Sequence, residues 1–397
     1  MRRLMILCLF AGCTTGNPPD DPNRFEPLEP LEVRIGPIEV GVAPHVEDFF
    51  VHYLPVEASE PVSTVSGDDF GLYYAFVSLV DQWPYVMRAE GAPRALPGER
   101  AETRAIAIAS SADGRIHFVF DPGTQIRYVR MHPDGSFDEP IVLDEARGRE
   151  PTLAIASDGQ VVVAWTRDAA DPSESSAEIV VARGEPYAGT MIFGPGVVAN
   201  ADCCTDFEGN PALAMSGASL SLDREGRAHL LYEWSSIFDT VIDYVYEDGD
   251  AFSAPLVVAE AAFSPCPALH VDESGTAHVT YIRDVETSVF YAQVRDGEVF
   301  DQGAIFTPET GRATLALMTF DAGGVMHVAL SESHGSIRYL RIEDEVMARV
   351  TIVDEEGTYA RLTPRAGGFY IAPDGKPITA FSHGSEAQVA VGLPSAD

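Results

Sequence analysis

The stretch Asp272-Glu273-Ser274-Gly275-Thr276-Ala277-His278-Val279 sets the pattern on which most of the chain is built, an Asp/Gly turn followed by an apolar strand. The pattern returns at the turn glycines Gly114, Gly159, Gly226, Gly324 and Gly375, and in degenerate form at Gly71. Successive glycines stand 43 to 51 residues apart, except for one interval of 67. This period is typical of one four-stranded propeller blade. The sequence therefore predicts an all-β protein, a β-propeller of seven antiparallel blades, with six as the alternative.

Each repeat also contains the other strands that a blade requires. In the third repeat, apolar runs at residues 153–156 and 161–165 flank the Asp158-Gly159 turn, and two further runs follow at 179–181 and 191–193. Short apolar runs bounded by turn residues are typical of buried strands. The last repeat ends after one strand beyond its inner hairpin, so we expect residues 33–42 to supply the missing strand and close the ring.

Composition agrees with a large exported β protein. Of the 397 residues, 34 are Gly and 28 are Pro, and 46% are hydrophobic, so the chain can bury a core while breaking into short strands. The 61 acidic and 26 basic residues give a formal charge of −35, which repels nucleic-acid phosphates and anionic membrane surfaces. We therefore expect no nucleic-acid partner, and a monomer whose scattered charge keeps it in solution.

The N-terminus has the features of an export signal. Arg2 and Arg3 precede a short apolar run, and Ala11 and Gly12 stand directly before Cys13. This arrangement resembles the signal of bacterial lipoproteins, and the resemblance implies lipidation of Cys13. An ordinary secretory signal is the alternative. The apolar run is too short for a transmembrane helix, which needs roughly 20 residues.

Three segments follow from this interpretation: a signal peptide at residues 1–12, a lipidated cysteine with a proline-rich acidic tether at 13–32, and the propeller at 33–397. Membrane contact would occur only through the lipid anchor. The expected location is the bacterial cell envelope, at the outer membrane. A secreted or periplasmic protein is the alternative.

The repeats from residue 33 to 395 resemble those of bacterial sialidase-like (BNR-type) seven-bladed β-propellers. Sialidases carry an Asp box, Ser-x-Asp-x-Gly-x-x-Trp, between the two outer strands of a blade. The corresponding turns here, at Asp134-Gly135, Asp248-Gly249 and Asp296-Gly297, lack its Ser and Trp. The resemblance therefore implies the fold without implying sialidase activity.

Propeller geometry predicts where ligand-binding residues would gather. The links between blades and the loops joining second to third strands share one face, and such loops often carry function. The candidate ligand-binding residues on that face are Arg104, Arg149, Arg167, Trp234, Arg283, Arg312 and Arg361. A guanidinium group binds oxyanions through two parallel hydrogen bonds, so these arginines suit a carboxylate or sulfate ligand. The alternative is that they pair with acids such as Asp168 and hold neighbouring blades together.

Four histidines, His117, His229, His278 and His327, each stand three residues after a turn glycine. Equivalent positions on different blades lie too far apart to ligate one zinc ion. We interpret these histidines as hydrogen-bonded packing residues, and we expect no metal and no cofactor.

Three cysteines remain once the signal has been removed and Cys13 has been lipidated. Cys203 and Cys204 lie in the insertion that lengthens one repeat, and Cys266 lies in the next link between blades. An oxidising compartment favours a disulfide from the insertion to Cys266. A bond between the adjacent cysteines and a reduced catalytic thiol are the alternatives.

Two function classes follow. The preferred class is a lipid-anchored binding or scaffold propeller for a glycan or protein ligand at the cell surface, because no nucleophile or metal motif is evident. The alternative is a sialidase-like glycoside hydrolase or polysaccharide lyase acting on acidic sugars. In that alternative the arginines between blades would hold a sugar carboxylate, and Tyr359, Glu233 or Asp168 would act as acid, base or nucleophile. The sequence favours a binding protein over an enzyme and identifies no catalytic residue.

Overall fold

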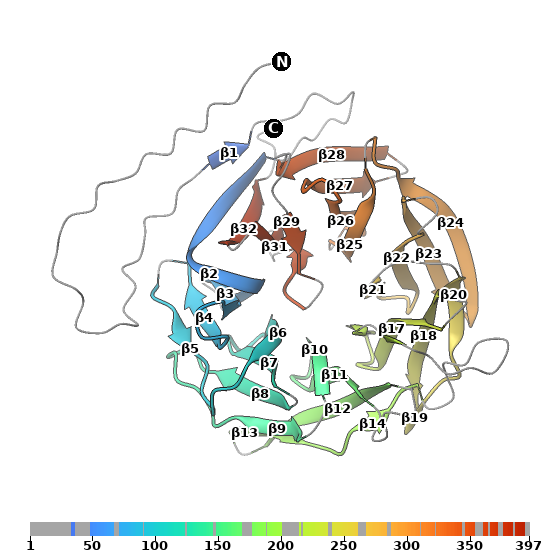
Figure 1. Cartoon of the computed structure of the whole chain (residues 1–397). Coiled ribbons are helices and arrows are strands. Elements are labelled where there is room, and N and C mark those ends of the chain that lie inside the picture. Colours follow the sequence, from blue (N-terminus) through green and yellow to red (C-terminus); the bar gives the residue numbers. More distant parts are fainter. Residues whose placement is uncertain are drawn as a thin grey trace.

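The computed structural model is built from β-strands arranged as seven blades around a central axis (Figure 1). No helix occurs among the residues that the structure describes. The described residues are 33–35, 48–66, 71–89, 91–123, 125–145, 148–168, 177–187, 189–200, 214–215, 217–236, 240–260, 267–283, 287–309, 311–321, 323–343, 346–353, 360–363, 366–371, 376–383 and 386–393.

Blades two, five and six are plain four-stranded antiparallel sheets whose strands run in sequence order from the axis outward. Blade two contains β6 (Thr103–Ser110), β7 (Ile116–Pro122), β8 (Ile126–Met131) and β9 (Ile141–Asp144). Blade five contains β21 (Ala268–Val271), β22 (Ala277–Ile282), β23 (Val289–Arg295) and β24 (Glu298–Phe306). Blade six contains β25 (Ala313–Phe320), β26 (Met326–Glu332), β27 (Ile337–Glu343) and β28 (Val346–Val353).

Blades three and four follow the same order, with some of their strands divided into two pieces. Blade three contains β10 (Gly148–Ile155), β11 (Val161–Arg167), β12 (Glu178–Tyr187), β13 (Thr190–Phe193) and β14 (Val197–Val198). Blade four contains β15 (Ala214–Met215), β16 (Ser219–Leu222), β17 (Ala228–Ser235), β18 (Thr240–Asp248), β19 (Ala251–Phe252) and β20 (Leu256–Glu260).

The first and last blades share one long strand, β2 (Asp48–Ser66). Its first half pairs with the last strand of the chain, from Asp48↔Leu393 to Glu57↔Glu386, and its second half is the inner strand of blade one. Blade one also contains β3 (Gly71–Ser78), β4 (Pro84–Arg88) and β5 (Arg94–Ala95). Blade seven also contains β29 (Ala360–Leu362), β30 (Phe369–Ile371), β31 (Pro377–His383) and β32 (Glu386–Leu393).

The predicted seven-bladed ring closed by an N-terminal strand is confirmed, but the strand predicted to close it is wrong. Residues 48–57 occupy the place beside the last strand and complete blade seven. The short strand β1 (Val33–Ile35) pairs with β2 instead, and residues 36–42 lie outside the described part of the chain. The register of β2 shifts between Tyr53 and Glu57 and between Ser59 and Val62. Such irregularities allow the strand to contain prolines, which cannot donate to a regular ladder.

The core lies between the blades. Seven clusters of buried hydrophobic residues occur in the described part of the chain, one at each boundary between neighbouring blades. The second strands pack on both of their faces, so every residue of β7, β22 and β26 is buried. Because burying one large apolar side chain contributes roughly 1.5 to 3 kcal/mol, adjacent blades hold one another in place.

The predicted Asp/Gly turns connect the first and second strands of the blades. Gly114, Gly159, Gly226, Gly275 and Gly324 all have φ between 79° and 86°, a conformation that residues with a Cβ rarely adopt. The outer turn at Asp296-Gly297 has two positive φ values, 53° and 76°, as a type I′ hairpin requires. These turns confirm the repeat that the sequence predicts, except at Gly375, which lies outside the described residues.

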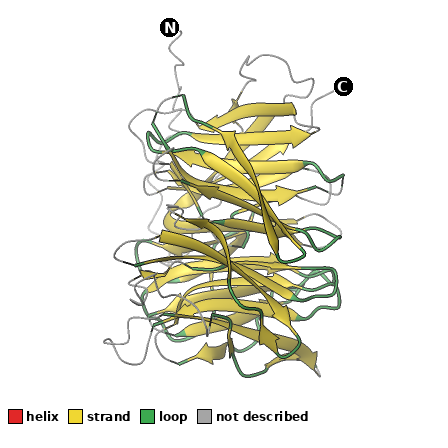
Figure 2. Ribbon diagram, turned by 90° about the vertical axis from the view of Figure 1, so that its right-hand side faces the viewer, coloured by secondary structure: helices red, strands yellow, loops and turns green. Residues whose placement is uncertain are grey.

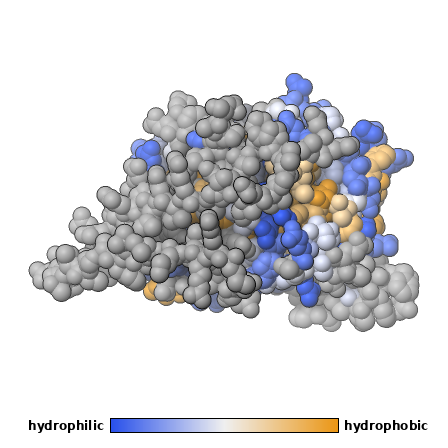
Figure 3. Space-filling model, turned by 90° about the horizontal axis from the view of Figure 1, so that it is seen from above, coloured by the Kyte–Doolittle hydropathy of each residue, from blue (hydrophilic) through white to orange (hydrophobic). Residues whose placement is uncertain are grey.

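Seen from the side, the strands run between two faces of the ring, and the turns and loops gather at both faces (Figure 2). We call the face that carries the first-to-second-strand turns the turn face, and the opposite one the loop face. At the rim, hydrophobic residues lie among hydrophilic ones where described residues are visible (Figure 3). Within the described part of the chain, no helix has the length and apolarity needed to span a membrane.

Candidate functional site

The predicted ligand-binding residues all lie at strand ends on the loop face. Arg104, Arg149 and Arg361 lie in the innermost strands β6, β10 and β29, and Arg312 directly precedes β25. The remaining three lie at the outgoing ends of second strands: Arg167 in β11, Trp234 in β17, and Arg283 just after β22. The structure therefore places the set on one face, but the side chains fall into two groups.

Arg149 and Arg167 form contacts within the protein. The Arg149 Nε lies 3.0 Å from Asp168, another of its nitrogens lies 3.2 Å from Glu150, and a third donates to the carbonyl of Met215 at 3.1 Å. Because Met215 belongs to the next blade, Arg149 links blades three and four. Arg167 donates to the carboxylate of Glu178 at 2.8 Å within its own blade. Both arginines therefore pair with acids, but only Arg149 also holds two neighbouring blades together.

Arg283 and Trp234 are also engaged. The Arg283 guanidinium lies 3.0 Å from Asp301 and 4.4 Å from the centre of the Phe290 ring. Trp234 is 6% exposed, and its indole N–H donates to Asp243 at 2.7 Å. A tryptophan buried in this way packs between blades, and its ring faces are not open for stacking on a sugar.

Arg104, Arg312 and Arg361 form the second group, because all three are exposed. The Arg104 side chain is 66% exposed and lies 3.7 Å from Glu102, a distance at which an ion pair in water contributes little. The group spans blades two, six and seven. These three arginines remain the loop-face candidates for an oxyanion.

Asp121, at the end of β7, is a loop-face acid that is only 1% exposed and is hydrogen-bonded to the backbone. Its carboxylate accepts hydrogen bonds from the backbone N–H groups of Arg104 at 2.9 Å and Ala105 at 2.6 Å. Its second oxygen accepts from the N–H of Glu150 in blade three at 3.2 Å. Asp121 therefore joins the inner strands of two blades.

The axis contains a cavity of about 140 Å³. Its lining residues are Thr152, Ala218, Ser219, Leu220, Ala268, Leu269, Leu317, Met318, Ala366 and Phe369. None of these lining residues is acidic or basic. Ala366, in the segment between β29 and β30, reaches across the axis, where its carbonyl accepts a hydrogen bond from the N–H of Ile108 in blade two at 3.0 Å. The cavity is thus small and lined by uncharged residues.

Several predictions fall on residues outside the described part of the chain. Cys13, Cys203, Cys204 and Cys266 all do, and so does Tyr359. Lipidation, the disulfide and a catalytic role for Tyr359 therefore stay predictions.

The turn face contains a hydrogen-bonded Asp–His–Tyr triad that recurs in blades four, five and six. The histidine Nε2 lies 3.1 to 3.3 Å from an aspartate oxygen, and its Nδ1 is hydrogen-bonded to a tyrosine hydroxyl of the next strand. The triads are Asp223–His229–Tyr244, Asp272–His278–Tyr291 and Asp321–His327–Tyr339. Because a carboxylate only accepts hydrogen bonds, Nε2 carries the proton and Nδ1 accepts from the tyrosine. The histidines are hydrogen-bonded packing residues, as predicted.

The electrostatics of the triads follow from burial. Burial lowers the pKa of His229 and of His327, and the aspartate beside each counteracts part of that shift. Burial alone would raise the pKa of Asp272, but hydrogen bonds from Ser274 and His278 outweigh it and lower the pKa to about 2. His229 and His327 are therefore neutral at neutral pH, each beside an aspartate whose own pKa is lowered. No group of metal-ligating side chains is found among the described residues.

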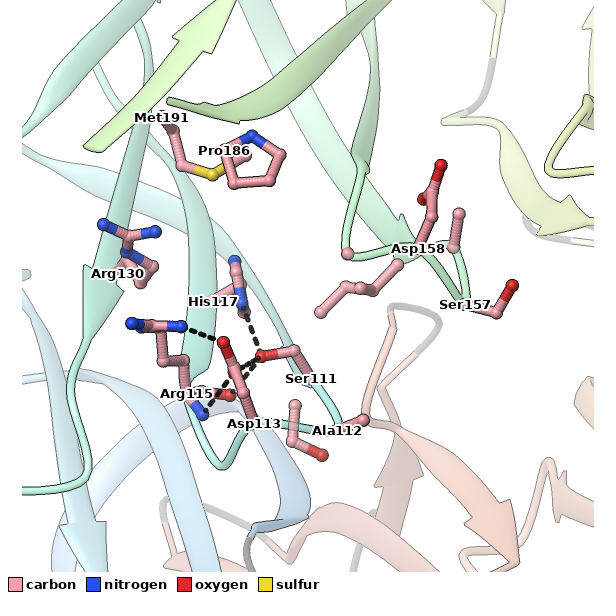
Figure 4. Close-up of a pocket in the computed structure, with 14 residues that line it drawn as sticks. Ser111, Ala112, Asp113, Arg115, His117, Arg130, Ser157, Asp158, Pro186 and Met191 are labelled. Atoms are coloured by element: carbon pink, nitrogen blue, oxygen red, sulfur yellow. Dashed lines mark hydrogen bonds and ion pairs between the residues drawn. The ribbon is translucent and has the colours of Figure 1, made fainter. Parts of the chain in front are cut away.

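Blade two departs from this pattern. His117 is hydrogen-bonded to Tyr128 at 2.7 Å as in the other blades, but its Nε2 lies 3.1 Å from the hydroxyl of Ser111, which replaces the aspartate. Burial, followed by the positive charges of Arg130 and Arg115, lowers the pKa of His117 to about 3. The residues around His117 line a cleft of about 380 Å³ between blades two and three, shown in Figure 4.

Sequence reasoning missed this cleft because it placed function on the loop face. The available signal was the spacing Asp-x-x-Gly-x-x-His, which begins with Asp223, Asp272 and Asp321 in three repeats but with Ser111 in the repeat of His117. A position that breaks a repeat is a candidate for a local role.

The fold resembles those of several solved structures, although the sequence identities are low. No protein-family model and no curated protein matches the sequence. Among solved structures, the sialidase of Trypanosoma rangeli matches with 10% identity and a TM-score of 0.53 over 86% of this chain and 59% of the sialidase, so the match spans less than two thirds of that enzyme. A protein of unknown function from Dyadobacter fermentans matches with 12% identity and a TM-score of 0.50 over 86% of this chain and all of the other.

Virginiamycin B lyase from Staphylococcus aureus matches with 12% identity and a TM-score of 0.49, over 87% of this chain and 99% of the lyase. Identities this low concern architecture alone. The chain is therefore a seven-bladed β-propeller with a sialidase-like fold.

Proposed function

We propose that the protein is a lipid-anchored β-propeller of the bacterial cell envelope that binds an acidic glycan or a protein ligand on its loop face without cleaving it. The observation that carries this proposal is the axial cavity, whose lining contains no acidic side chain. Glycoside hydrolysis in most families needs two carboxyl groups roughly 5 to 10 Å apart across the scissile bond. The uncharged residues that line this small cavity offer no such pair.

The loop-face arginines support an oxyanion as the bound group. Arg104, Arg312 and Arg361 are exposed, whereas Arg149, Arg167 and Arg283 are partly buried and lie against the carboxylates of Asp168, Glu178 and Asp301. On a chain with a net charge of −35, an exposed arginine is a local point of attraction for carboxylate or sulfate groups. The ligand would therefore contact the first three arginines. Of the second three, Arg149 links two blades, and Arg167 and Arg283 form ion pairs within their own blades.

A glycan array of uronic, sialic and sulfated sugars, read beside an assay for newly formed reducing or unsaturated ends, tests the proposal. We expect binding without turnover in the wild-type protein. The double variant Arg104→Ala/Arg361→Ala should bind the acidic glycans clearly more weakly and keep its stability, since exposed charges alter stability by less than about 1 kcal/mol. The matched control is Arg295→Ala, which removes a 60% exposed arginine from the end of β23 and should bind normally.

The alternative function, a sialidase-like hydrolase or polysaccharide lyase, is favoured by the shared fold. Turnover of an acidic glycan would establish it and would overturn the binding-only proposal. Binding that persists unchanged in the double variant would show that the exposed arginines do not hold the ligand.

The envelope location depends on Cys13, and Cys13→Ala tests it separately. We expect the wild-type protein in the membrane fraction and the variant in the soluble fraction, because the proposed lipid on Cys13 would be the sole membrane contact. A variant that still pellets with membranes would contradict lipidation at this cysteine.

A further inference from the structure

The cleft on the turn face between blades two and three is formed by three hairpins. The β6–β7 turn contributes Ser111 and Arg115, the β10–β11 turn contributes Ser157 and Asp158, and the β12–β13 hairpin contributes Met191. In Figure 4, His117, Arg115 and Arg130 of blade two lie across the cleft from Ser157 and Asp158 of blade three. Its volume of about 380 Å³ falls in the range of roughly 300 to 1,000 Å³ that is common for small-molecule sites.

The wall of this cleft lacks a carboxylate that three other blades possess. In those blades an aspartate oxygen lies 3.1 to 3.3 Å from the histidine Nε2. In blade two the hydroxyl of Ser111 occupies that place, 3.1 Å from the Nε2 of His117, and donates its own hydrogen to Asp113 at 2.6 Å. A hydroxyl is smaller and uncharged, so in blade two the histidine Nε2 contacts a hydroxyl in place of a carboxylate, and the carboxylate of Asp113 lies beyond that hydroxyl, paired with Arg115.

Two guanidinium groups lie beside this position. The Arg130 side chain is 3% exposed and is ion-paired with Asp138 at 2.7 Å. Arg115 is ion-paired with Asp113, and its Nε is buried without a hydrogen-bond partner among the described residues. A buried guanidinium nitrogen without a partner is costly, and an oxyanion oxygen is the acceptor that suits it best.

The remaining lining defines the rest of the ligand. Ile155, Pro186 and Met191 form an apolar wall, and Ser157 adds a hydroxyl. Of the nearby acids, Asp113 and Asp138 are paired with arginines, and Asp158 accepts a hydrogen bond from the backbone N–H of Gln160 at 3.0 Å. An apolar wall beside hydroxyls and guanidinium groups matches a sugar ring that carries one charged substituent.

We propose that this cleft binds the carboxylate or sulfate group of an acidic sugar beside Ser111, His117 and Arg115, next to the position that an aspartate holds in blades four to six. The oxyanion accepts a hydrogen bond from the Nε of Arg115 and lies beside the Ser111 hydroxyl, which itself accepts from the Nε2–H of His117. The sugar ring lies against the apolar wall. This site is on the opposite face from the ligand site proposed above and does not depend on it.

Isothermal titration calorimetry of the full chain tests the proposal, with sodium glucuronate and glucose 6-sulfate as probes and glucose as the neutral reference. The wild-type protein should bind both anionic sugars and should bind glucose at least about tenfold more weakly, a difference of about 1.4 kcal/mol. Ser111→Asp supplies the missing carboxylate from within the chain. It should keep the fold, as the three natural triads do, and lower the affinity for both anionic sugars by about tenfold or more.

Arg115→Ala gives a second test that does not depend on the serine, and it should lower the affinity similarly. The matched control is Arg227→Ala, because Arg227 has the same place in its repeat, directly after the turn glycine, but lies beside a complete triad. That variant should bind both anionic sugars as the wild type does, and in the loop-face double variant, which lacks the other proposed site, Ser111→Asp should still lower the affinity by about tenfold or more. Failure of both anionic sugars to bind, equal affinity for glucose, or unchanged affinity in both Ser111→Asp and Arg115→Ala would overturn the proposal.

Discussion

Blade two and blades four to six contain the same histidine–tyrosine pair and differ in the residue that completes it. Asp223, Asp272 and Asp321 place a charged oxygen beside the histidine Nε2, whereas Ser111 places a hydroxyl there. Both ring nitrogens of the histidine are hydrogen-bonded within the blade in all four cases, but only three of the histidines contact a carboxylate. In blade two the histidine lies beside a cleft flanked by two arginines. The cleft proposal therefore depends on the replacement of one aspartate in a repeated packing arrangement.

The largest effect that this comparison predicts is on the pH dependence of stability, because it involves several blades at once. His117, His229 and His327 have lowered pKa values, so between about pH 6.5 and their folded pKa values the unfolded chain binds more protons than the folded one. Their contribution to stability is full above about pH 6.5 and is lost as the pH falls.

Asp272 adds to the same trend at lower pH, since its pKa of about 2 lies below the unfolded value of roughly 3.9. Its contribution is full above pH of about 4 and is lost toward pH 2. Urea unfolding at pH 7.5, 5.5 and 4 should therefore show a steadily falling free energy of unfolding. A value that does not change across this range would mean that the triads are not buried as described.

The next effect is the loss of one triad histidine. His229→Ala leaves the buried carboxylate of Asp223 and the hydroxyl of Tyr244 without their partner, and we expect a loss of about 3 kcal/mol. His117→Ala should cost less, about 2 kcal/mol, because Ser111 carries no charge. Urea unfolding of both variants measures the difference. A larger loss in blade two than in blade four would reverse the comparison.

A smaller loss of stability, equal in blades two and four, is expected for the histidine–tyrosine hydrogen bond that both blades contain. Tyr128→Phe and Tyr244→Phe each remove the hydroxyl bonded to the histidine Nδ1, at 2.7 and 2.5 Å respectively. Each variant should lose about 1 kcal/mol, since each loses one hydrogen bond of the same kind. Thermal unfolding of the pair checks this, and clearly unequal losses would show that the tyrosine–histidine bond differs between the blades.

The smallest effect concerns the arginine after the turn glycine. The Arg227 side chain is 47% exposed and lies 2.7 Å from Asp223, so solvent screens much of this ion pair. Arg227→Ala should lower the free energy of unfolding by less than about 1 kcal/mol, as urea unfolding would measure. A greater loss would make Arg227 an essential part of the triad.

The repeat predicts most of the fold because its signals are local. The Asp/Gly turns need positive φ, which favours glycine, and the strands beside them are buried, which favours apolar residues. Both features can therefore be recognised in the sequence. The closing strand was missed for a physical reason. β2 contains Pro55 and Pro61, which argue against a strand, yet both lie where its register shifts and the ladder is already interrupted.

The candidate sites were less predictable, because they depend on how neighbouring blades are placed. The sequence places Arg149 on the loop face but does not show that its guanidinium reaches the carbonyl of Met215 in the next blade. It likewise does not show that hairpins around Ser111, Asp158 and Met191 enclose one cleft, since these residues meet only after the blades have packed.

The most direct measurement of the central claim is a crystal structure of the protein soaked with glucuronate. We expect electron density for the sugar in the cleft between blades two and three, with its carboxylate beside His117 and Arg115. We expect no sugar beside His229, His278 or His327, where an aspartate already occupies the place. An empty cleft, or sugar bound equally beside the complete triads, would contradict the claim.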